Sequence, residues 1–283
     1  MDDVVVLVVI TFVASIVNGA LGYGFSSITV PVALLFYTNR ILNPALVLVE
    51  LVINAYVLFI NRRSIPNIFR RVAPILGGLA VGVGIGSYLL SLVEPAWIKF
   101  VTYFFLLPLI LLQAAGIRKP IQAEKAIAVP FGLGLGTLYS VTTISGPPLA
   151  LLFNNQGYPK QDFRAALGII RLAESSLTAI AYGFIGFYSA GSMEIIPYIV
   201  PSVIVGIPLG TLLIRLMDPE TFRRICMAFD GLIVGFGLSR VSGELDLASP
   251  VTTYAILAIV ILVNGVLLLR FFKERTDPQR APP

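Results

Sequence analysis

Long, continuous runs of apolar residues alternate with short polar connections along almost the whole chain. Several runs are near 20 residues, about the length that an α-helix needs to cross a bilayer. Apolar and polar residues do not alternate within the runs, so the strands of a membrane β-barrel are not expected. The pattern predicts an all-α integral membrane protein with apolar segments at 4–37, 43–61, 67–93, 96–117, 122–153, 163–188, 194–217, 219–239 and 251–272.

Segments 4–37 and 122–153 differ from the others because they are long and are interrupted by Gly, Ser, Thr and Pro. The interruptions predict that each segment is a broken re-entrant hairpin, with two arms of about 14 residues that pass the midplane without crossing. The remaining segments are expected to be single crossings. The alternative is that each long segment forms one tilted helix, and the apolar pattern alone leaves it open.

The two parts of the chain resemble each other, which indicates an internal duplication. Residues 31–36 match residues 148–153 at a shift of 117, and Gly19 then matches Gly136. Further on the shift is 124, and it pairs Gly82, Gly86, Leu92 and Pro95 with Gly206, Gly210, Leu216 and Pro219. We therefore expect a first repeat at 1–117, a second repeat at 118–239, an extra transmembrane helix at 251–272 and a polar tail at 273–283.

The basic residues predict the orientation of the repeats, because Lys and Arg concentrate in the cytoplasmic loops of membrane proteins. Most of the 20 Lys and Arg residues lie in five stretches: 62–71, 118–125, 154–164, 215–224 and the C-terminal end. All five are cytoplasmic if segment 122–153 enters and leaves on the same side. The two repeats then have inverted topologies, with the N-terminus outside and the C-terminus in the cytoplasm.

Composition excludes several classes of function. The chain has no histidine and one cysteine, which excludes histidine metal sites, serine–histidine triads and an internal disulfide. No phosphate-binding loop of the ATP-driven pumps is present. Charged residues make up 12% of the chain and are not interleaved with aromatic ones, so nucleic acid is not an expected partner. The protein is not expected to be an enzyme.

The breaks in the two long segments are the first candidates for a substrate site. Paired broken helices in inverted repeats are typical of secondary transporters, whose substrates bind where the breaks meet. A helix that begins at such a break presents free N–H groups and partial positive charge, which suit an anion. The expected substrate-binding residues of the breaks are Gly22, Gly24, Ser26, Ser27, Thr142, Thr143, Ser145 and Gly146.

Three ionisable residues inside apolar segments are further candidates, because burying a charge in a membrane is costly. Arg171 is expected to bind the anion with its planar fork, and Glu50 or Glu174 to carry a coupling proton. A tentative alignment of the repeats sets Glu50 opposite Arg171 and Asn54 opposite Ser175. The alternative is a structural ion pair, for which Glu174 is well spaced, since it follows Arg171 by three residues on a helix.

Four stretches of the chain resemble the sulfite exporter TauE/SafE family. They are NGALGYGFSSITVPVALLF, ISGPPLALLFNNQGYPKQDFRAAL, GVGIGSYLLSLVEP and GIPLGTLLIRLMDP, in two related pairs. The resemblance implies a bacterial inner-membrane permease for sulfite, sulfoacetate or other organosulfonates that works without ATP hydrolysis. The chain departs from the family at residues 25–27 and 142–145, where hydroxyl and aromatic side chains replace glycine.

Together these observations predict a secondary transporter for a small oxyanion that works by alternating access, with proton coupling left open. An anion channel of the same architecture and a carrier of a small carboxylate are the alternatives. No cofactor and no metal are expected. The expected partners are the small-molecule anion and membrane lipid, and assembly into a homo-oligomer stays open.

Overall fold

The computed structural model describes residues 2–92, 95–115, 124–216 and 219–276, and these ranges are helical with no strand. The prediction of an all-α protein is therefore confirmed. By length and composition, α1, α3, α4, α8, α9 and α11 can cross a membrane. The helices are α1 (Asp2–Leu21), α2 (Phe25–Ala33), α3 (Asn39–Ile60), a 3-10 turn η1 (Arg62–Ser64), α4 (Ile65–Leu92), α5 (Pro95–Ala114), α6 (Glu124–Thr142), α7 (Gly146–Asn155), α8 (Lys160–Ile185), α9 (Ala190–Leu216), α10 (Pro219–Glu244) and α11 (Pro250–Thr276).

Each of the two long segments contains two helices. Segment 4–37 holds α1 and α2 with a break at residues 22–24, and segment 122–153 holds α6 and α7 with a break at residues 143–145. The expectation of equal arms is wrong, because α1 and α6 have 20 and 19 residues whereas α2 and α7 have 9 and 10. The breaks lie where the sequence placed them, and the re-entrant course through the membrane stays a prediction.

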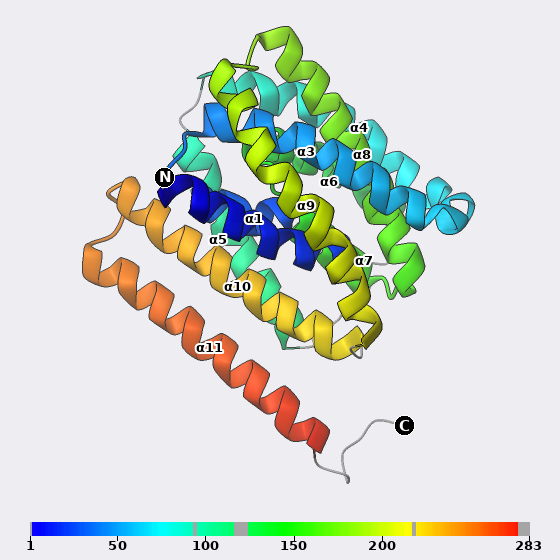
Figure 1. Ribbon diagram of the computed structural model, residues 1–283. Helices are drawn as coiled ribbons and strands as arrows, with labels where there is room; N and C mark the ends of the chain where they lie inside the picture. The colour runs from blue at the N-terminus through cyan, green and yellow to red at the C-terminus, as the bar shows by residue number, and fades with distance from the viewer. Residues whose placement is uncertain (1, 93–94, 116–123, 217–218, 277–283) are drawn as a thin grey trace.

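The helices pack in reciprocal pairs. Helix α4 packs along α6, and α9 packs along α1; α3 crosses α8, and α5 packs against α10 (Figure 1). A duplicated chain predicts this pattern. If α1 corresponds to α6 and α4 to α9, the contact of α4 with α6 in one combination is matched by the contact of α9 with α1 in the other. Helix α11 lies outside the pairs, along α10, as expected for a segment that is not part of the duplication.

Glycines allow the closest of these crossings. A Cβ atom on Gly82 of α4 would lie 2.1 Å from the carbonyl oxygen of Leu133 on α6. A Cβ atom on Gly210 of α9 would likewise lie 1.9 Å from the carbonyl oxygen of Ile16 on α1. The helix backbones can approach this closely only because glycine has no side chain, a common device between membrane helices.

These contacts also fix how the repeats correspond. Gly86 and Gly210, which differ by 124 positions, would meet the carbonyl groups of Thr137 and Ile16, which differ by 121. Helices α1 and α6 end at residues 21 and 142, again 121 apart. The shift of 117 suggested by residues 31–36 is therefore wrong by about one helical turn for these helices, whereas the later shift of 124 agrees with the contacts.

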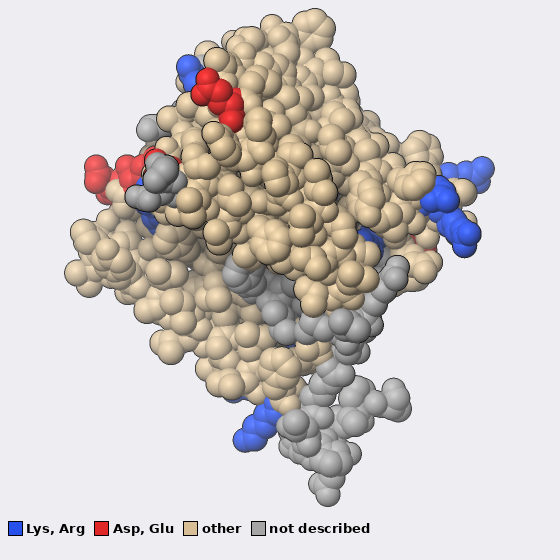
Figure 2. Space-filling model, viewed as in Figure 1, with Lys and Arg blue, Asp and Glu red and all other residues tan. Residues whose placement is uncertain are grey.

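The surface is apolar and the interior contains polar groups, the reverse of a water-soluble protein. Phe184 and Val251 are 90% and 78% exposed, whereas Glu50 and Arg171 are 0% and 1% exposed. Figure 2 shows a broad face without charges, with Asp and Glu near the N-terminus and most of the visible Lys and Arg at the right and lower edges. This distribution suits helices that face lipid at their middles and water at their ends.

We predict that Gly82→Ala destabilises the protein and that Gly84→Ala, on the same helix, does not. The added methyl group at position 82 would overlap the Leu133 carbonyl, and overpacking of this kind costs about 1–3 kcal/mol. Nothing lies within 4 Å of a Cβ atom at position 84, and alanine is the better helix former. Thermal unfolding in detergent measures both, and equal melting temperatures would contradict the packing.

Candidate functional site

The two breaks have the same backbone geometry. Gly22 follows the last residue of α1; it has a φ of 85°, and its N–H donates to the Asn18 carbonyl at 2.7 Å. Thr143, 121 positions later, follows the last residue of α6; it has a φ of 57°, and its N–H donates to the Tyr139 carbonyl at 2.6 Å. A β-branched residue rarely adopts positive φ, so Thr143 is a strained position. Strain of this kind often accompanies a functional site.

Buried side chains cap the carbonyl ends of the two broken helices. Arg164 of α8, 7% exposed, donates to the carbonyl groups of Gly19 at 3.1 Å and Ala20 at 3.4 Å. Asn43 of α3 donates to the carbonyl of Val141 at 2.7 Å. These are equivalent contacts, since Asn43 and Arg164 differ by 121 positions, as do Ala20 and Val141. A positive charge also suits a helix C-terminus.

Sequence reasoning missed Arg164, which was interpreted as part of a basic cytoplasmic loop. Its position in α8 and its hydrogen bonds give it a different role, holding the end of α1 beside the first break. The signal that could have found it is the correspondence of the repeats. At a shift of 121, Arg164 matches Asn43, a polar residue inside an apolar segment.

The two breaks lie against each other. A Cβ atom on Gly146, the first residue of α7, would lie 2.7 Å from Cδ2 of the Tyr23 ring in the first break. Glycine is therefore required at position 146 for this close approach. Gly24, with a φ of 104°, precedes α2 on the other side of Tyr23. The breaks thus meet in the structure, as the comparison with broken-helix transporters predicts.

An ion pair between Glu50 of α3 and Arg171 of α8 lies beside the breaks. Arg171 Nη2 is 2.6 Å from Glu50 Oε1, and both side chains are buried. Glu50 also accepts hydrogen bonds from Ser26 at the start of α2 and from Tyr139 near the end of α6, each at 2.7 Å. The carboxylate therefore joins α8 to one helix from each break.

This pairing agrees with the tentative alignment that set Glu50 opposite Arg171. The second pair in that alignment is also close, since Asn54 Nδ2 lies 3.5 Å from Ser175 Oγ and 3.2 Å from the Arg171 carbonyl. The expected local ion pair is not formed: within the described ranges, the only carboxylate within 4 Å of Arg171 is that of Glu50.

Glu174 is instead bound to the second break. Ser145, directly before α7, donates to Glu174 Oε2 at 2.5 Å, and Glu174 is fully buried. Each short helix therefore has a serine at its beginning that donates to a carboxylate on α3 or α8. The Ser26–Glu50 and Ser145–Glu174 bonds tie the positions of both breaks to the ionisable residues.

The other predicted residues of the breaks are buried but bind locally. Thr142 Oγ1 donates to the Leu138 carbonyl and accepts from the Ile144 N–H, and Thr143 Oγ1 donates to the Thr142 carbonyl. Ser27 is 3% exposed. The structure therefore assigns these threonine hydroxyl groups to shaping the second break.

Several buried polar atoms near the breaks have no hydrogen-bond partner within the part of the chain that the structure describes. Arg171 leaves Nε and Nη1 free, and Glu174 leaves Oε1 free. The amide of Asn18 and the hydroxyl of Thr178 are also unpaired. Buried polar groups are normally satisfied, so unpaired ones indicate a place for a ligand or water. An unpaired guanidinium N–H is a charged donor that suits an oxygen of an oxyanion.

Comparison with known proteins agrees with the four stretches that carry the resemblance. The profile of the family described as "Sulfite exporter TauE/SafE" matches residues 7–238, which include both breaks and the central ion pair. No curated protein and no solved structure matches the chain.

Proposed function

Because the chain belongs to the sulfite exporter TauE/SafE family, we propose that it moves a small oxyanion across the bacterial inner membrane by alternating access. The proposed substrate is sulfite or an organosulfonate such as sulfoacetate. The observation that carries the proposal is that two Arg171 donors, Nε and Nη1, have no hydrogen-bond partner among the described residues although Arg171 is fully buried where the two breaks meet.

Arg171 is the proposed anion ligand. Its Nη2 atom is occupied by Glu50, which holds the side chain in place, while Nε and Nη1 remain available. A guanidinium keeps its positive charge, and an N–H group of this kind forms a strong, charge-assisted hydrogen bond to an oxyanion. The N-terminal ends of α2 and α7 add partial positive charge to the same region.

Asn18 is a proposed second ligand, although it is not among the residues expected from the sequence. At the shift of 121, Asn18 corresponds to Tyr139, and Glu50 corresponds to Arg171. Since Tyr139 donates to Glu50, the correspondence predicts that Asn18 faces Arg171. Asn18 is fully buried and its amide is unpaired within the described ranges, so it is free to donate to an anion held by Arg171.

The charges of the buried site favour coupling to protons. Glu50 and Glu174 carry two negative charges against the single positive charge of Arg171, and all three side chains are at most 1% exposed. An anion added to this set would leave two uncompensated charges in a region of low polarity, which is very costly. Proton uptake by a glutamate offsets that cost, and Glu174 is the better candidate because no described residue forms an ion pair with it.

Burial of the site supports a carrier over a channel of the same architecture. The predicted site side chains are at most 3% exposed, so no open aqueous path reaches them in this conformation. A carrier shows saturation and stimulation by substrate on the opposite side, whereas a channel passes single-molecule currents.

We also propose that the repeats are inverted in the membrane. Support comes from the helix directions. Helix α5 begins at the edge of the molecule where its counterpart α10 ends, so the two run in opposite directions (Figure 1). Helix α3 begins at this same edge, and the four arginines at 62, 63, 70 and 71 lie at the opposite edge, where α3 ends and α4 begins. The positive-inside tendency then places the N-terminus outside.

Reporter fusions at residues 158 and 190 test this orientation. The inverted arrangement predicts that a fusion at 158 reports the cytoplasm and that a fusion at 190 reports the outside, because α8 crosses between them. Two fusions that report the same side, or the reverse assignment, would contradict it.

For the binding site, we predict that Arg171→Lys lowers anion transport in proteoliposomes and that the double variant Glu50→Gln/Arg171→Gln abolishes it. Loss of one charged hydrogen bond costs about 1.5–3 kcal/mol, or roughly 10–100-fold in affinity. The double variant removes both members of the ion pair, so neither partner is left buried without the other, and folding is disturbed less than by removing one partner alone.

Arg62→Gln is the matched control, because Arg62 is exposed and stacks on Phe59 away from the breaks. The variants are compared by gel filtration and melting temperature before transport is measured with sulfite, sulfoacetate, sulfate, taurine and simple carboxylates. A folded double variant with the wild-type rate would refute the role of Arg171, and transport of carboxylates alone would refute the sulfur substrate.

A further inference from the structure

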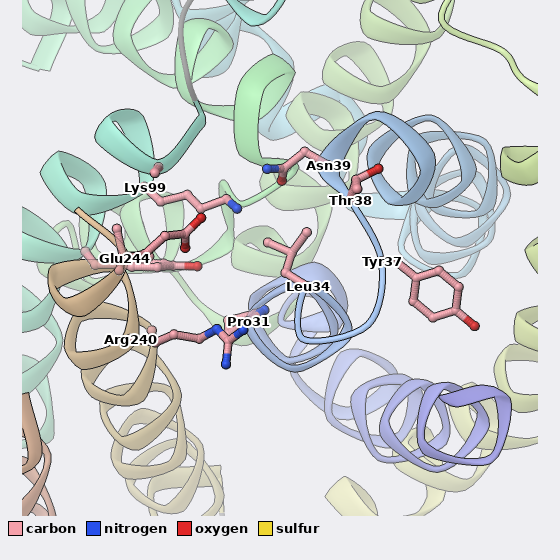
Figure 3. Close-up of a pocket in the computed structure, with 12 residues that line it drawn as sticks. Pro31, Leu34, Tyr37, Thr38, Asn39, Lys99, Arg240 and Glu244 are labelled. Atoms are coloured by element: carbon pink, nitrogen blue, oxygen red, sulfur yellow. The ribbon is translucent and has the colours of Figure 1, made fainter. Parts of the chain in front are cut away.

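A cavity of about 520 Å³ lies at the end of the molecule where the N-terminus is found. It is formed by the end of α2, the start of α3, the start of α5 and the end of α10. In Figure 3, Lys99, Arg240 and Glu244 point into the cavity from α5 and α10, and Leu34 and Asn39 approach it from the opposite side. Its volume is in the range of small-molecule sites.

Two of the three charged groups in this cavity are cations, although the surrounding end of the molecule is acidic. Lys99 is 5% exposed, and no hydrogen bond or ion pair joins it to any other described residue. The hydroxyl of Tyr103, which is 1% exposed and also lines the cavity, is likewise unpaired among the described residues. Glu244 acts on the Lys99 ammonium electrostatically but forms no ion pair with it among the described contacts. Burying an ammonium without a direct partner is costly, so the cavity is suited to a ligand that binds it.

No function for Lys99 or Arg240 is predicted from the sequence. They are two of the few basic residues outside the five basic stretches, and the positive-inside tendency does not explain them. They do not cap a helix either, since neither forms a hydrogen bond to the carbonyl groups at the end of α2 within the described ranges. Their shared cavity explains why two cations occur at this end.

We propose that this cavity is a second anion-binding site, a vestibule in which Lys99 and Arg240 hold the transported oxyanion before it reaches Arg171 or after it leaves. The role in transport rests on the proposed function, whereas the binding of a small sulfonate or carboxylate does not. Tyr103 adds a neutral donor, and Glu244 limits the net charge of the site to +1, which favours exchange over tight retention.

Helix α2 connects the vestibule to the central site. Its first turn carries Ser26, which donates to Glu50, and its end contributes Pro31 to the cavity, followed by Leu34. The eight residue-to-residue steps from Ser26 to Leu34 span about 12 Å at 1.5 Å per step. One short helix therefore contacts both sites, so a shift of α2 that changes access to Arg171 also reshapes the vestibule.

The test is calorimetric titration of the purified protein with sulfoacetate and with methanesulfonate, in detergent free of anionic lipid. Five proteins are compared: wild type, Arg171→Gln/Glu50→Gln, Arg240→Gln, Lys99→Gln/Arg240→Gln, and Arg40→Gln. Arg40 is an exposed arginine near the same end that does not line the cavity, so it controls for general surface charge. Arg240 is exposed, and its single variant is therefore expected to fold normally.

The vestibule predicts that the central double variant still binds the anion and that Lys99→Gln/Arg240→Gln loses this binding event, while Arg40→Gln matches wild type. Arg240→Gln alone is expected to weaken the event by about tenfold, as for loss of one partly exposed charged contact. This binding result does not require that the wild-type protein transports the anion. Failure of the proposed transport function can therefore be distinguished from failure of the vestibule. In proteoliposomes that do transport, the same variants raise KM and leave kcat unchanged.

Unchanged binding in Arg240→Gln and in Lys99→Gln/Arg240→Gln would overturn the proposal, as would wild-type protein that binds neither anion. A phosphatidylglycerol headgroup has similar charge, so the titration is repeated in nanodiscs with and without that lipid. Loss of sulfoacetate binding when phosphatidylglycerol is added would identify a lipid site and would also overturn the vestibule.

Discussion

The buried ion pair between Glu50 and Arg171 is the interaction on which the rest of the site depends. It joins α3 to α8, the two helices that cross at the centre, and Glu50 extends it to one helix of each break through Ser26 and Tyr139. Removing one partner of a buried pair costs about 3–5 kcal/mol, because the other charge is left unpaired. The same pair holds the arginine through Nη2, while its Nε and Nη1 donors have no partner among the described residues. A structural contact thereby orients the group that is proposed to bind the substrate.

The internal duplication that the sequence predicts would explain how a single chain builds such a centre. Equivalent residues of the repeats lie near each other where α3 meets α8, and equivalent side chains, Asn43 and Arg164, cap the two broken helices. The repeats have diverged at the positions that carry charge. Glu50 corresponds to Arg171, so two equivalent positions that face each other carry opposite charges and form an ion pair. Tyr139 likewise corresponds to Asn18. Divergence at corresponding positions thus supplies a carboxylate, Glu50, that is paired, and donors on Arg171 and Asn18 that have no partner among the described residues.

Much of this was predictable from the sequence. Apolar runs gave the helices, Gly and Pro gave the breaks, and the cost of burying charge singled out Glu50, Arg171 and Glu174. Matching letters misplaced the first part of the duplication by one turn, because Pro31 and Pro148 lie at different depths in α2 and α7. The partner of Arg171 also depended on tertiary packing, since Glu174 satisfied the local spacing rule and Glu50 lies 121 residues away. Arg164 was hidden because a basic residue near a loop usually reports topology.

The most direct measurement of the central claim is a structure of the protein with sulfite or sulfoacetate bound, determined in lipid nanodiscs. We predict oxyanion density within hydrogen-bond distance of Arg171 Nε or Nη1 and of the Asn18 amide, with the Glu50–Arg171 pair intact. An anion bound with Arg171 uninvolved, or an Arg171 whose Nε and Nη1 donors are both filled by other side chains in every state, would contradict it.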